Sequence, residues 1–156
     1  MSGVRIGVME QGAKQIDSGL VVFRSNLIDE AFRHASRVYL SGHLAQPQPM
    51  LPHLASTPLE MGISQYDHFT CDKPHRHPKN YEFNFVAAGE THVYDIDAGE
   101  VHELPAGSAY ILKPGHAYVT KHAAGTRVVF FKAPGGNDKQ IVEVSEELLN
   151  WMETSI

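Results

Sequence analysis

Residues that form turns recur at intervals of about 8 to 12 residues through the middle of the chain, and this pattern limits the fold more than any other feature. Between the turns lie segments rich in Val, Ile, Tyr, Phe and Thr, the residue types that strands prefer. We therefore expect strands at residues 82–86, 92–96, 109–112, 117–121 and 127–132. The intervals leave no room for crossover helices, so the sheet is expected to be antiparallel. Closure into a barrel or jelly roll would remove its exposed edges.

The N-terminal third of the chain has a mixed pattern. The segment from Gly19 to Phe23 predicts a short strand, and Ser25 or Asn26 could then cap a helix. The apolar residues expected on one face of that helix are Leu27, Ala31, Phe32, Ala35 and Val38. Four prolines between residues 46 and 58 then predict a connector.

The C-terminal residues predict a short helix. Ser145 is a suitable N-cap, and Leu148, Leu149 and Met152 are expected on the buried face. The 156 residues are enough for one domain with one core. We predict an all-β domain in three parts: an N-terminal strand and helix extension over 1–58, a barrel over 59–133, and a tail with a helix over 134–156.

Composition argues against several classes of protein. The net charge is -5 and no Lys/Arg cluster is present, so a nucleic-acid partner is not expected. No apolar run is long enough to span a bilayer, and the first ten residues do not resemble a signal peptide. Cys71 is the single cysteine and cannot form an internal disulfide. We expect a cytoplasmic protein with no membrane partner.

Histidines are unusually frequent, and they cluster in the middle of the chain. There are ten, and four of them, at positions 68, 75, 77 and 92, lie close together in sequence. His75 and His77 would share one face of a strand because side chains alternate. The turn at residues 78–80 resets that alternation, so Glu82 can face the same interior. Two imidazoles and a carboxylate with open positions suit one divalent transition metal, namely Fe, Mn, Ni or Zn.

These residues also carry a resemblance to a known family. The spacing His-x-His, four residues, Glu, six residues, Gly is that of the first cupin motif, with Gly89 as its last member. Cupins are double-stranded β-helix barrels of the jelly-roll type, and the resemblance implies that His75, His77 and Glu82 ligate the metal. The resemblance covers residues 59–133. A polar pocket without metal is the alternative for these three residues.

The second cupin motif is only partly present. It is expected to start at Gly107, and its Gly at 115 is in place. The position of the family's fourth ligand, usually His, holds Tyr118. A phenolate could serve there because a metal lowers the pKa of its ligands. Alternatively, His116 or His122 could supply an imidazole from the same strand face.

The run from Gly107 to Leu112 and the spacing from Glu82 to Tyr110 to position 118 resemble a narrower group, ectoine synthase. That group closes a ring by eliminating water, and there a Glu, a Tyr and a His at these spacings bind iron. Glu82 and Tyr110 match, whereas Tyr118 replaces the His. The resemblance implies a cousin that acts on a different substrate.

We expect an enzyme that acts on a small polar metabolite by lyase, cyclase or isomerase chemistry, with the metal as Lewis acid. Tyr110, Tyr118 or His122 would move the proton, and Asn84 and Arg127 could bind substrate. The alternatives for Tyr110, Arg127 and His122 are a core aromatic, a surface salt bridge and a surface strand end. An Fe(II)-dependent dioxygenase and a non-catalytic small-molecule or sugar-binding cupin remain alternative functions. A homodimer is expected.

Overall fold

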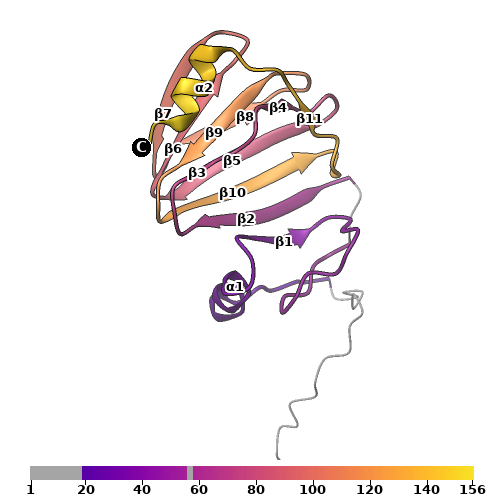
Figure 1. Ribbon diagram of the computed structural model, residues 1–156. Coiled ribbons are helices and arrows are strands. Elements are labelled where there is room, and N and C mark those ends of the chain that lie inside the picture. The colour runs from indigo at the N-terminus through magenta and orange to yellow at the C-terminus, as the bar shows by residue number, and fades with distance from the viewer. Residues whose placement is uncertain (1–18, 56–57) are drawn as a thin grey trace, which may run out of the picture.

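The computed structural model describes residues 19–55 and 58–156, and two antiparallel sheets form its body (Figure 1). The first sheet has five strands, in the order β1 (Arg37–Ser41), β2 (Glu60–Tyr66), β10 (Thr126–Ala133), β5 (Tyr81–Ala88) and β8 (Ala109–Leu112). The second has the order β11 (Gln140–Ile141), β4 (His75–Arg76), β9 (Tyr118–His122), β6 (Glu90–Asp95) and β7 (Glu100–Pro105), and the short strand β3 (Thr70–Cys71) pairs with β9. The all-β jelly-roll prediction is confirmed.

The predicted central strands are present with small shifts of their ends. The strand at 109–112 has the expected bounds, and the other four became β5, β6, β9 and β10. The strand β7 was not predicted, because its side chains are mostly exposed and show no alternation between apolar and polar residues. In β10, by contrast, buried and half-buried positions alternate along the whole strand.

The N-terminal prediction was partly wrong. Residues 19–23 form no strand, and the helix α1 (Ser25–Phe32) begins after Arg24, which makes no side-chain capping bond. Val38 lies in β1 rather than on the helix, and it packs with Ala31, Leu40 and Leu51. Because β1 pairs with β2, this extension adds an edge strand to the first sheet.

The C-terminal helix α2 (Glu146–Glu153) lies against the second sheet (Figure 1). The Ser145 hydroxyl accepts a hydrogen bond from the Leu148 amide at 3.2 Å, which confirms the predicted cap. Leu148 packs against Tyr94 and Val119. Leu149 was expected to be buried, but it is 46% exposed. In the described residues, no helix is long and apolar enough to cross a membrane.

Candidate functional site

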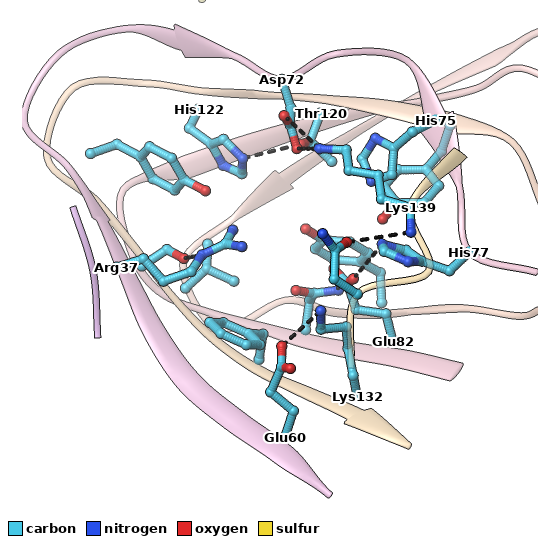
Figure 2. A pocket seen from close by; sticks show the side chains of 18 of the residues that line it. Arg37, Glu60, Asp72, His75, His77, Glu82, Thr120, His122, Lys132 and Lys139 are labelled. Atoms are coloured by element: carbon cyan, nitrogen blue, oxygen red, sulfur yellow. Dashed lines mark hydrogen bonds and ion pairs between the residues drawn. The ribbon is translucent and has the colours of Figure 1, made fainter. Parts of the chain in front are cut away.

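A cavity of about 260 Å³ lies between the two sheets, and polar side chains dominate its wall (Figure 2). Both sheets contribute to this wall, including the edge strand β1 of the first sheet, and so does the segment before β11. Its lining residues include all four predicted ligands and three further predicted site residues: His75, His77, Glu82, Tyr118, Asn84, Tyr110 and His122. Residues far apart in the sequence therefore meet in one chamber.

The two motif histidines present the same ring nitrogen to the cavity. Nδ1 of His75 lies 2.6 Å from the Lys73 carbonyl oxygen, and Nδ1 of His77 lies 2.6 Å from Oδ1 of Asp138. Each oxygen accepts a hydrogen bond from Nδ1–H, so the lone pair on Nε2 of each ring is left for a metal. Burial lowers the pKa of His75, which favours the neutral ring that a metal needs.

Glu82 supplies the carboxylate next to them. Its Oε2 lies 3.5 Å from Nε2 of His77, and its Oε1 accepts a hydrogen bond from the Asn84 amide at 3.2 Å. Two ligand atoms bound at about 2.1 Å in a tetrahedral site lie roughly 3.4 Å apart, so this pair fits one shared ion. The donor set of two imidazoles and a carboxylate therefore suits a divalent transition metal.

The third predicted ligand, His75, does not lie as close to the other two. Among the described residues, the group whose three ligand atoms all lie within 4.8 Å of one another is Glu90, His92 and Glu103, and it does not include His75. That group lies outside the lining of the cavity, and Nε2 of His92 is 2.9 Å from Oε1 of Glu90. Ligation by His75, His77 and Glu82 together therefore requires a side-chain movement.

Two tyrosines complete this end of the cavity. Tyr118 pairs with His75 across β9 and β4, and the two ring centroids are 4.5 Å apart. Tyr110 lies opposite Asn84 on the neighbouring strand. Burial raises the pKa of both hydroxyls, and the Glu82 carboxylate adds to the effect. Both side chains are therefore neutral hydroxyls near pH 7.

His122 and His116, the alternatives to Tyr118 as the fourth ligand, lie in different places. His122 lines the cavity, where its ring nitrogens lie 3.0 Å and 3.1 Å from the hydroxyls of Thr91 and Thr120. Its ring stacks on Tyr66 at 3.9 Å, and burial lowers its pKa to about 4. His116 is not in the lining; it pairs instead with two carboxylates, those of Asp95 at 3.0 Å and Asp97 at 3.3 Å.

Arg127 lies on the opposite side of the sheet from the cavity. On β10, Val128 and Phe130 line the cavity, so the alternation of side chains directs Arg127 outward. Its guanidinium lies 3.3 Å from Asp29 and 5.3 Å from the ring centroid of Phe32 in α1. Of the two residues predicted to bind substrate, Asn84 lies in the cavity and Arg127 does not.

Several charged lining residues were not predicted from the sequence. Nζ of Lys132 lies 2.7 Å from Oε1 of Glu60, and both side chains are buried. Nζ of Lys139 lies 3.2 Å from Oδ1 of Asp72. Arg37 enters from β1. These residues carry no local motif, so no sequence signal marks them; the pairing of distant strands brings them together.

The fold and the motif residues agree with the comparison against known families. The cupin domain family matches residues 70–131. No protein with curated annotation matches the chain.

Solved structures share the fold at low sequence identity. An uncharacterized conserved protein with a double-stranded β-helix domain from Klebsiella pneumoniae is 23% identical, over 57% of this chain and 78% of that chain, with a TM-score of 0.49. An RmlC-like cupin from Shewanella frigidimarina is 20% identical over 53% and 72%, with a TM-score of 0.48. The DMSP lyase DddQ from Ruegeria pomeroyi is 19% identical over 76% and 52%, with a TM-score of 0.52. At these identities the likeness concerns the fold.

Proposed function

We propose that this chain is a metal-dependent cupin enzyme that acts on a small polar metabolite by a lyase, cyclase or isomerase reaction. One observation carries the proposal. Nδ1 of each motif histidine lies within hydrogen-bond distance of an oxygen, and Nε2 of His77 lies next to the Glu82 carboxylate. This arrangement leaves Nε2 of each ring available as a ligand.

The residues that would hold the metal are His75, His77 and Glu82, with Tyr118 at the fourth position. The ion would be one divalent transition metal, that is Fe, Mn, Ni or Zn. When bound, it would polarise a carbonyl or carboxylate of the substrate as a Lewis acid. Asn84 holds Oε1 of Glu82 and so orients the carboxylate.

The proton-transfer group that we favour is Tyr110. It is a neutral hydroxyl in the same cavity and lies across the strand pair from Asn84. Both ring nitrogens of His122 already face threonine hydroxyls, which favours a place in the cavity wall over proton transfer. The fold is compatible with this chemistry, because the DMSP lyase DddQ resembles it with a TM-score of 0.52.

Metal content tests the proposal directly. We expect the purified protein to carry about one divalent ion per chain and Glu82→Gln to lose it. Glu103→Gln is the matched control, because Glu103 belongs to the Glu90, His92 and Glu103 group outside the cavity lining. Retention of the ion in Glu82→Gln, or its loss in Glu103→Gln, would contradict the assignment.

Turnover tests the reaction class. A panel of small hydroxy, keto and amino acids can be followed by NMR under air and under anaerobic conditions. Elimination or isomerisation that continues without oxygen supports the proposal. Strict dependence on oxygen would instead indicate the Fe(II) dioxygenase, to which a two-histidine, one-carboxylate site is also suited. Tight binding of a ligand without turnover would indicate a binding module.

A further inference from the structure

The cations of the cavity wall differ in their partners. Lys132 is paired with Glu60, and Lys139 is paired with Asp72. Arg37 has no carboxylate within ion-pair distance among residues 19–55 and 58–156 (Figure 2). It is the lining cation that the described chain leaves without a counter-charge.

Neutral groups hold Arg37 in place. Nε donates a hydrogen bond to the Ser64 hydroxyl at 2.9 Å, and the guanidinium carbon lies 4.9 Å from the ring centroid of Phe130. The hydroxyls of Tyr39 and Tyr66 also lie near it. These contacts orient the planar guanidinium but do not neutralise it. Arg37 is exposed as a residue, but it also lines the cavity without an opposite charge beside it, so an anion in the cavity would be attracted to it.

Arg37 is positioned where it can act together with the candidate metal centre. Its charge acts on the Glu82 carboxylate and on the hydroxyls of Tyr110 and Tyr118. Figure 2 shows its side chain entering the cavity across from His75 and His77. A second compartment of about 250 Å³ also has Arg37 in its wall, so a ligand can reach the guanidinium from either compartment.

The charges of the cavity wall favour an anionic ligand. The wall carries three cations from Arg and Lys and three carboxylates, so its own formal charge is balanced. A divalent ion on the histidines and Glu82 would add two positive charges. An anionic substrate would then be attracted both to that ion and to Arg37.

We propose that Arg37 binds a carboxylate of the substrate and that the substrate class of this cupin is therefore small carboxylic acids. The substrate assignment rests on the proposed function, whereas the anion site at Arg37 can be tested without it. The fork of a guanidinium matches the two oxygens of a carboxylate, which a lysine cannot reproduce. The edge strand β1, outside the matched cupin domain, would thus determine specificity.

The test uses succinate and its neutral diamide, succinamide, as probes of the full-length protein by calorimetry. Each is titrated into metal-loaded and metal-stripped protein. We expect succinate to bind both forms and succinamide to bind at least about tenfold more weakly. Arg37→Gln should weaken succinate binding by at least about tenfold in the metal-stripped form, where the ion cannot compensate.

The matched control is Arg127→Gln, because Arg127 lies on the outer face of the same sheet; it should bind succinate like the unmodified protein. Arg37→Lys keeps the charge and loses the fork, so we expect an intermediate affinity; it carries the test if Arg37→Gln does not fold. The inference is overturned if succinate does not bind, if succinamide binds equally well, or if the Arg37 variants bind succinate normally.

The two proposals fail separately. Normal succinate binding by the Arg37 variants, together with metal loss in Glu82→Gln, would overturn the carboxylate site and leave the metal centre standing. Arg37-dependent succinate binding, together with metal retained in Glu82→Gln, would overturn the metal centre and leave the anion site.

Discussion

Nδ1 of His77 lies 2.6 Å from Oδ1 of Asp138, a residue 61 positions further along the chain. The other oxygen of Asp138 accepts a hydrogen bond from the Lys79 amide at 2.8 Å. Burial disfavours the charged carboxylate, but the Lys79 amide and His77 outweigh it and hold the pKa of Asp138 below its usual range. Asp138 thus orients His77 and connects the segment before β11 to the turn after β4.

Substitution of Asp138 should weaken metal binding without removing a ligand. A carboxylate partner fixes the tautomer of a ligating histidine and raises its basicity, so we expect Asp138→Ala to lose roughly 10 to 100-fold in metal affinity. Asp138→Asn, which keeps an acceptor, should lose less. Competition with a chelator measures both. The exposed Asp67 provides the control Asp67→Asn, and equal affinities for all variants would contradict the role.

Phenylalanine substitutions separate the two tyrosines. Tyr118→Phe should weaken metal binding, because it removes the hydroxyl proposed for the fourth position while keeping the ring that packs on His75. Tyr110→Phe should retain the metal and lower turnover, because its hydroxyl is proposed to move a proton. Metal analysis of both variants checks this. The opposite result, with metal lost in Tyr110→Phe, would support a ligand set like that of ectoine synthase.

His122 should make folding stability dependent on pH. Its pKa is about 6.5 when unfolded and about 4 in the folded protein, because burial disfavours the charged ring. Above pH 6.5 this stabilising contribution is fully present, and as the pH falls toward 4 up to roughly 3 kcal/mol is lost, since the unfolded state takes up the proton first. Urea unfolding of His122→Gln should show a smaller loss between these pH values than the unmodified protein.

The control for this measurement is His102→Gln, because the His102 side chain is 50% exposed. Its pH dependence should equal that of the unmodified protein. Identical pH dependence of His122→Gln and the unmodified protein would show that His122 does not carry the effect.

Lys121 should hold the C-terminal helix to the sheet. It is 2% exposed, and Nζ lies 2.8 Å from the carbonyl oxygens of Trp151 and Thr154 and 4.0 Å from the ring centroid of Trp151. A cation at the last carbonyls of a helix stabilises it, so Lys121→Met should cost about 2 kcal/mol. Hydrogen exchange in α2 should accelerate. The exposed Lys113 gives the control Lys113→Met, for which no change is expected.

Gly89, the last residue of the first cupin motif, should not tolerate a side chain. It has φ +73°, and an added Cβ would lie 2.5 Å from the Thr126 hydroxyl. We expect Gly89→Ala to cost about 3 kcal/mol from the left-handed backbone and the clash together. Gly99→Ala is the matched control, because Gly99 has φ +71° and open space around it; it should cost only about 1 kcal/mol. Equal unfolding free energies would contradict the clash.

The sequence predicted the centre of the fold well, because local signals there are strong. Regular turns and β-rich segments indicated β5, β6, β8, β9 and β10, and Ser145 correctly marked the start of α2. The N-terminal part was predicted less well. Its apolar residues fit a helix and a strand equally, and only the pairing of β1 with β2 decides that Val38 belongs to a strand.

By itself, the sequence determined the cupin fold and the local motif of His75, His77 and Glu82, since strand alternation and one turn are enough to bring three neighbours to one face. The tertiary structure alone decided what surrounds them. Asp138 contacts His77 from the segment before β11, Arg37 reaches the cavity from β1, and Arg127 is directed away from it. Such placement depends on which strands pair and in what register, and these long-range contacts leave no periodic mark in the sequence.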